Sequence, residues 1–268
     1  MPLVAVRALE GRRGGRSYSA YRIFGSSGYL LALLVLPSIT GDVPWLFRAS
    51  ALLSVVSSLP LLGFRAADAP QAERAPLLPV LRQPRLAWTF VAVFFFALAA
   101  PAVFGFQCVY ARELGASTRF IGVLSASLGV VAVLALPVAG RLIDARGPAT
   151  LLLLAFIAQP LRALTVSFVG RYELLLLPQL FHMLTWTGIE LGAVFYVTRL
   201  AAEGRKATAL SVLRGAMTVG MMVGYALSGR LARDAGFPVM YRRVAALSAV
   251  GLVVFVAMLR LTRQRRAA

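Results

Sequence analysis

Long apolar segments separated by short polar turns make up most of the chain. An α-helix needs about 20 apolar residues to cross the hydrocarbon core of a bilayer. Eight segments meet this requirement: 19–39, 44–64, 86–110, 119–140, 148–168, 173–198, 207–229 and 239–260. Turns such as "TGDVP", "ARGPA" and "RDAGFP" join them. The pattern predicts an all-α fold, a polytopic membrane bundle of about eight transmembrane helices.

One connection is much longer than the others. Residues 65–85 read "RAADAPQAERAPLLPVLRQPR" and are rich in Pro, Ala and Arg, a composition typical of a linker. We expect this linker to divide the chain into residues 1–64, with two spans, and residues 86–268, with six.

Composition and charge support a membrane protein and predict its orientation. Of the 268 residues, 59% are hydrophobic and 14% are charged, whereas about a quarter of a soluble domain is charged. With a cytoplasmic N-terminus, seventeen Lys and Arg fall on the cytoplasmic side, eight on the other side, and three within spans. This bias predicts that both termini and the linker are cytoplasmic and that the turns at 40–43 and 169–172 are external. The expected location is the inner (plasma) membrane.

The same residues argue against several other classes of protein. The net charge of +18 comes almost entirely from arginines between apolar segments, and no nucleic-acid-binding motif accompanies them, so we expect no nucleic-acid partner. The only cysteine, Cys108, lies in an apolar run, so neither a disulfide framework nor a metal cluster is expected. The N-terminus does not have the pattern of a signal peptide. With one histidine, His182, and no acid pair beside it, we expect neither an enzyme nor a cofactor.

Four short stretches are similar to one transporter branch. "GRLIDARG" at 140–147 resembles the loop signature of the major facilitator superfamily. "YRIFGSSGYLL" at 21–31, "LRQPRLAW" at 81–88 and "LFHMLTWTG" at 180–188 resemble the fifth, seventh and tenth spans of its lactose permease and phenylpropionate permease branch. The loop residues that carry the signature are Gly140, Arg141, Asp144, Arg146 and Gly147. The two glycines are expected to permit a tight turn.

The resemblance implies a fold and a function. The eight spans would correspond to spans 5–12 of a twelve-span carrier, so residues 1–64 would be the remnant of an N-terminal half, and we expect that this chain alone does not catalyse transport. The implied function is secondary active transport, descended from a proton-coupled symporter of a small sugar-like or aromatic-acid solute. Lactose itself is not expected, because the acids of the lactose permease pattern are absent, for example at Ala102 and Gly105. The alternatives are a non-transporting membrane fragment and a drug or metabolite exporter. The partners would be the lipid bilayer, a small solute and protons; the sequence does not indicate an oligomeric state.

Ionisable side chains inside the spans are the candidates for substrate and proton binding, because they are costly in a membrane and usually face an interior path. His182 titrates near neutral pH and is expected at the same depth as Arg162; alternatively, it is a histidine satisfied inside the bundle. Arg22 and Tyr29 share one helix face and would contact substrate, although Arg22 could instead anchor its span at the headgroups. Gln107 is either a site residue or a helix–helix hydrogen bond.

A second charged pair is expected nearer the cytoplasm. Glu190 and Arg214 lie about 13 Å and about 12 Å from the cytoplasmic ends of two antiparallel spans, counting about 1.5 Å per residue. We therefore predict that they pair, as a structural or gating latch; the alternative is a protonated Glu190 with Arg214 reaching the headgroups. In the same span, Ala216, Gly220, Gly224 and Ser228 recur every four residues, which predicts close approach of another helix.

Overall fold

The computed structural model describes residues 48, 51–52, 55–56 and 76–267, with side chains described as far as residue 262. The described residues form helices and short connections, as the all-α prediction requires. The predicted spans 19–39 and 44–64 and most of the linker therefore lie outside the described residues, apart from the few positions between 48 and 56.

The elements follow one another as a run of helices. Their bounds are α4 Leu77–Leu81, α5 Pro84–Phe104, α6 Phe106–Glu113, α7 Thr118–Arg146, α8 Pro148–Val166, η2 Tyr172–Phe181, α9 His182–Thr187, η3 Gly188–Ala193, α10 Val194–Leu200 and α11 Lys206–Ala267. Within the described residues, five helical segments are long and apolar enough to cross a membrane: 84–113, 118–146, 148–166, 172–200 and 206–262.

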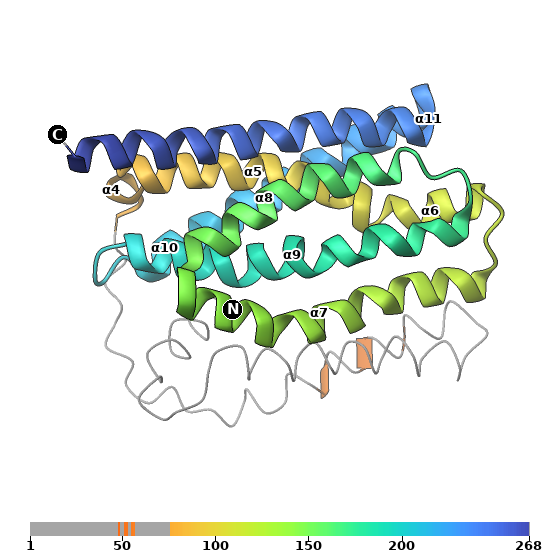
Figure 1. Cartoon of the computed structure of the whole chain (residues 1–268), viewed down its shortest axis with the longest axis horizontal. Helices are drawn as coiled ribbons and strands as arrows, with labels where there is room; N and C mark the ends of the chain where they lie inside the picture. The colour runs from red at the N-terminus through yellow and green to blue at the C-terminus, as the bar shows by residue number, and fades with distance from the viewer. Residues whose placement is uncertain (1–47, 49–50, 53–54, 57–75, 268) are drawn as a thin grey trace.

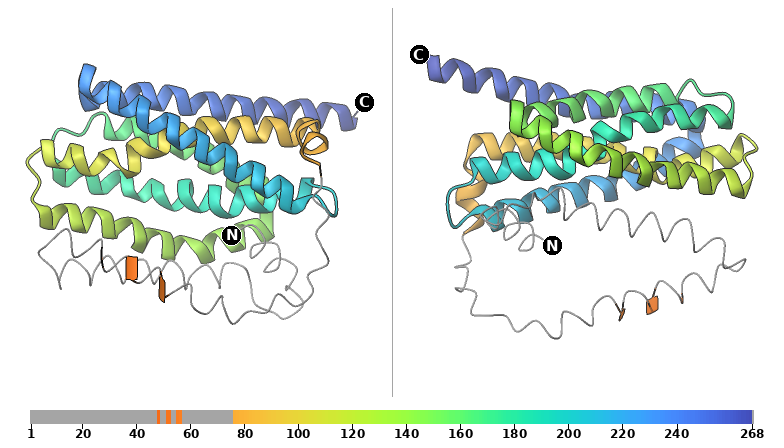
Figure 2. Two further views of the ribbon diagram at one scale, coloured as in Figure 1. Left: turned by 180° about the vertical axis from the view of Figure 1, so that it is seen from behind. Right: turned by 60° about the horizontal axis from the view of Figure 1, so that its bottom comes forward.

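The last of these segments crosses twice. At Gly236 the backbone is non-helical, with φ 77° and ψ 165°, a conformation that glycine adopts without a steric penalty. The chain folds back there, so that the two arms of α11 run in opposite directions (Figures 1 and 2). The described part of the chain thus makes six passes.

Helix α5 packs against both arms of α11 at very short range. A Cβ added to Gly220 would lie 2.7 Å from the Phe94 carbonyl oxygen, and one added to Gly251 on the returning arm would lie 2.7 Å from the Ala92 carbonyl oxygen. A Cβ added to Gly224 would lie still closer to the Leu98 carbonyl oxygen. Only glycine allows such an approach, so the close helix contact predicted from the small residues of this span is confirmed.

Two predicted connections are more helical than expected. The end of the 65–85 linker forms the short helix α4, and its Val80 is buried in the core with 1% of its surface exposed. The loop signature is mostly helix, because α7 continues to Arg146. Gly147, with φ 81°, makes the turn alone, so the expectation that Gly140 also shapes the turn is wrong.

Candidate functional site

The pass from 172 to 200 changes its helix type three times. It begins as the 3₁₀ segment η2, continues as α9, loosens into the π-turn η3 and ends as α10. In a 3₁₀ segment each carbonyl accepts from the N–H three residues later. For the Leu175 carbonyl that residue is Pro178, which has no N–H. The carbonyl of Leu175 is therefore free to accept from side chains.

Two glutamines use this free carbonyl. Gln107 Nε2, from α6, donates to the Leu175 oxygen at 3.2 Å, and Gln179 Nε2 donates to the same oxygen at 3.1 Å. Both side chains are buried. Gln107 therefore forms the helix–helix hydrogen bond that the sequence left open as an alternative. The bond to Leu175 also fixes the Gln179 amide, so that its Oε1 points away from its own helix.

Arg162 is the polar centre of the bundle. Its side chain, on α8, is fully buried. Its Nη2 donates to Gln179 Oε1 at 2.8 Å and to the Val103 carbonyl at 3.4 Å, and its Nη1 lies 3.2 Å from His182 Nδ1 and 3.5 Å from Thr185 Oγ1. Among the described residues, every one of these hydrogen-bond partners is neutral or can be neutral, and none is a carboxylate. The structure thus buries a cation without an acidic partner in the part of the chain that it describes.

The contact with Arg162 determines the protonation state of the His182 ring. A guanidinium has only donors, so His182 Nδ1 must accept in this hydrogen bond, and the ring is neutral with its proton on Nε2. A protonated imidazole would present N–H groups at both nitrogens and would lose the bond at 3.2 Å. The prediction that His182 lies at the depth of Arg162 is confirmed, and the two side chains are in direct contact.

An aromatic pair covers this polar centre. The Phe104 ring lies edge-on to the His182 ring at 5.2 Å and to Trp186 at 5.5 Å, and Trp186 stacks on His182 at 6.2 Å. The Arg162 guanidinium also sits 5.2 Å from the centre of the Phe104 ring. Phe104 and Trp186 are only partly buried. They therefore form the layer between the buried charge and the surface of the described bundle.

The buried centre has polar groups to spare. Arg162 Nε and both amide atoms of Gln159, one helical turn earlier on α8, have no hydrogen-bond partner among the described residues. Buried polar groups are normally satisfied by protein, water or ligand. The α8 face that carries Arg162 therefore has hydrogen-bonding atoms that the described residues leave unused.

Glu190 and Arg214 form a second polar contact, eight residues further along this pass. Arg214 Nη1 donates to Glu190 Oε1 at 2.6 Å and Nη2 to Oε2 at 3.0 Å, a two-pronged ion pair. The predicted pairing is confirmed. Positions 182 and 190 would differ by about 80° on a regular α-helix. The extra residue of the π-turn η3 reduces this to about 20°, so both side chains face the interior.

Glycines make room for the π-turn. A Cβ on Gly192 would lie 3.1 Å from the Leu152 backbone nitrogen, and Gly188 lies still closer to Ala155. The wide turn therefore packs directly on the α8 backbone. Glu190 therefore lies on a turn that packs against α8, the helix that carries Arg162.

The remaining predicted residues lie elsewhere. Arg22 and Tyr29 are outside the described residues. The end of α7 carries three exposed residues of the loop signature, Arg141, Asp144 and Arg146, none of which belongs to the polar centre. Gly147 lies next to the Arg199 guanidinium. The structure joins Arg162 with His182, links Gln107 to them through Leu175, and keeps Glu190 with Arg214 as a separate pair.

Sequence reasoning missed four residues of the polar centre: Phe104, Gln179, Thr185 and Trp186. Thr185 and Trp186 follow His182 by three and four residues and so share its helix face. That spacing was a usable signal. Gln179 had a weaker one, a polar residue directly after a proline in an apolar span.

A model of the MFS_1 like family matches residues 3–243. Among curated protein sequences, none matches the chain. The crystal structure of the E. coli fucose:proton symporter FucP is similar, with a TM-score of 0.54 and 19% sequence identity over 81% of this chain. The match covers 54% of the symporter, so the chain spans about half of its length. At this identity the likeness shows the fold alone.

Proposed function

Because the chain belongs to the MFS_1-like family, a family of multi-pass membrane transporters, we propose that it is the solute-binding part of a secondary active transporter and that Arg162 binds an anionic group of a small solute. The observation that carries the proposal is the buried guanidinium with neutral partners. An uncompensated charge in an apolar interior is costly. A solute carboxylate would compensate it, and Arg162 Nε is a donor still available for one.

The neighbouring histidine supports coupling to protons. Protonation of His182 places a second cation against Arg162, 3.2 Å away in the neutral state. A bound anion in contact with both groups would neutralise one of these charges. Anion and proton would then bind best together, which is the thermodynamic basis of symport.

The aromatic layer supports a solute with an apolar or planar face. Phe104 and Trp186 lie beside the charged centre, and aromatic rings bind both rings and the apolar faces of sugars. This agrees with a small sugar-like or aromatic-acid solute, and within that range the buried cation favours an acid.

Trp186 provides the test. In a Trp45→Phe/Trp88→Phe background, its fluorescence would report binding of 3-phenylpropionate, its uncharged amide, glucuronate and glucose to the purified full chain. We expect each acid to bind at least tenfold more tightly than its uncharged analogue. This preference should persist in Arg162→Lys and disappear in Arg162→Gln. Equal affinity for acid and amide would overturn the proposal.

Proton linkage needs a separate readout. Binding of the acid in weakly buffered solution should take up about one proton per solute, and His182→Gln should bind without this uptake. Binding that takes up no proton in the unmodified chain would leave an anion carrier but refute the symport step.

A further inference from the structure

One end of the bundle carries a cluster of arginines that the site does not use. Arg85, at the start of α5, donates through Nη2 to the Thr262 carbonyl at 3.4 Å, which joins the beginning of α5 to the end of α11. Arg82 and Arg260 are exposed beside this junction. The sequence continues after Thr262 with arginines at 263, 265 and 266. Among the described side chains, two chain segments thus bring Arg82, Arg85 and Arg260 to one corner.

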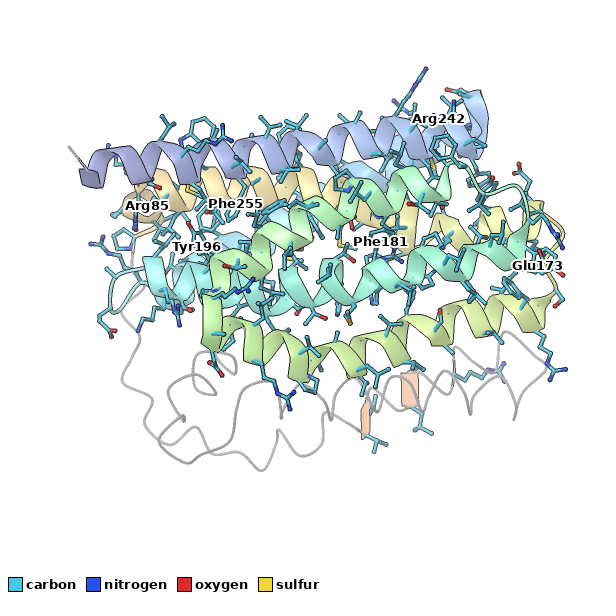
Figure 3. All side chains as sticks on the ribbon, viewed as in Figure 1. Arg85, Glu173, Phe181, Tyr196, Arg242 and Phe255 are labelled. Carbon is cyan, nitrogen blue, oxygen red and sulfur yellow. The ribbon has the colours of Figure 1, made fainter. Side chains whose placement is uncertain are left out.

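Within the part of the chain that the structure describes, the two segments that form this corner contain no acid. Neither segment 76–88 nor segment 235–268 contains Asp or Glu. The nearest acid along α10–α11, Glu203, already pairs with Lys206 at 2.6 Å. The opposite end of the bundle differs, because arginines there share the surface with acids such as Glu173 and Asp234; Figure 3 shows Arg85 at one end and Glu173 and Arg242 at the other.

Apolar side chains surround these charges near the start of α5 and the end of α11. Helix α4 packs on the end of α11 through Val80 and exposes Leu77, Leu78 and Leu81 (Figure 1). Trp88, one turn after Arg85, is half exposed. Exposed leucines on a short surface helix and a tryptophan near the end of a span are typical of the boundary between acyl chains and headgroups.

We propose that this corner, formed by Arg82, Arg85 and Arg260 with α4 and Trp88, is a binding site for the headgroup of an anionic phospholipid. Guanidinium groups bind phosphate through paired hydrogen bonds, and the leucines and Trp88 would contact the acyl chains. A zwitterionic headgroup carries its own cation and cancels this attraction. The site is independent of solute binding at Arg162.

Trp88 is a built-in reporter for the test. The full chain with Trp45→Phe and Trp186→Phe would be reconstituted into vesicles that mix phosphatidylcholine with brominated phosphatidylglycerol, or the reverse. Bromine quenches Trp88 when the labelled lipid is its neighbour, so the two mixtures give the relative affinity for the two lipids. One arginine near an anionic surface is worth about fivefold in affinity. We therefore expect phosphatidylglycerol to be favoured by about threefold or more.

Charge variants decide whether the corner is responsible. Arg82→Gln/Arg260→Gln, which alters only exposed side chains, should reduce the preference, and adding Arg85→Gln should bring the ratio to about one. The control, Arg230→Gln/Arg233→Gln/Arg243→Gln, removes three charges at the opposite end and should keep it. Equal quenching by both lipids, or a preference that survives the triple variant, would overturn the proposal. So would loss of the preference in excess inorganic phosphate but not in chloride of equal ionic strength, because the site would then take free phosphate.

Discussion

The ion pair between Glu190 and Arg214 makes an asymmetric prediction about stability. The Glu190 side chain is 5% exposed and that of Arg214 is 36% exposed. Replacing Arg214 by Gln takes the two-pronged cationic partner from a buried carboxylate. Replacing Glu190 by Gln leaves Arg214, whose longer side chain is partly exposed and can extend its guanidinium toward the polar end of its span.

The magnitudes follow from these exposures. Removing one partner of a buried pair costs about 3–5 kcal/mol, and we expect Arg214→Gln to lie near the lower end of this range. For Glu190→Gln we expect about 1–2 kcal/mol, because the partly exposed guanidinium can move toward polar surroundings and is less dependent on its partner. The double variant Glu190→Gln/Arg214→Gln should be less destabilised than the sum, with a coupling energy of about 2 kcal/mol.

The assay is unfolding of the purified chain in mixed micelles with increasing dodecyl sulfate, followed by the loss of helical circular dichroism. Arg230→Gln, an exposed arginine on the same helix, is the control and should change stability by less than about 0.5 kcal/mol. In cells, the charge swap Glu190→Arg/Arg214→Glu should restore expression lost in the single variants. Additive effects in the double variant, or a larger loss for Glu190→Gln than for Arg214→Gln, would refute the reasoning.

Three further predictions come from other parts of the chain. Gly220→Ala should destabilise the bundle by about 1–3 kcal/mol, since its Cβ would lie 2.7 Å from the Phe94 carbonyl oxygen, whereas Gly215→Ala, with nothing within 4 Å, should be neutral or stabilising in the same unfolding assay. Gln179→Leu should weaken acid binding to Arg162 at least tenfold while Gln179→Asn retains part of it, and unchanged binding in Gln179→Leu would contradict the positioning role. In a Cys108→Ala background, a cysteine at Ala72 should react with an impermeant maleimide only after the cells are opened; labelling of intact cells would reverse the predicted topology.

The depth of a side chain along its span could be predicted from the sequence, but the face of the helix on which it lies could not. Residues rise by about 1.5 Å each along any of these helices, so counting from the helix ends placed Glu190 beside Arg214 and His182 beside Arg162. The face of the helix depends on the turn type. The π-turn at 188–193 leaves no mark in the apolar pattern, because every position there is apolar or small apart from Glu190.

The backbone conformation of the fourth described pass, residues 172–200, could not be predicted from the sequence either. The apolar run at 173–181 predicts an α-helix, yet the structure has a 3₁₀ segment there. The role of Gln179 depends on this difference, since Pro178 leaves a different carbonyl without a donor in an α-helix than in a 3₁₀ segment. Without the backbone, the sequence could name Arg162 but not the side chain that orients it.

The Leu175 carbonyl has an implication for which substitutions this chain can accept. Any residue other than proline at position 178 would bring an N–H back to that oxygen and compete with the two glutamine amides that donate to it. The amide of Gln179 could then turn, and the shortest hydrogen bond of Arg162, at 2.8 Å, would change although neither residue had been replaced. Substitutions at 178 and 179 should therefore show strong epistasis. A glutamine that is indispensable beside proline would become replaceable once the proline is gone, so the acceptable residues at the charged centre are set by a position that never touches it.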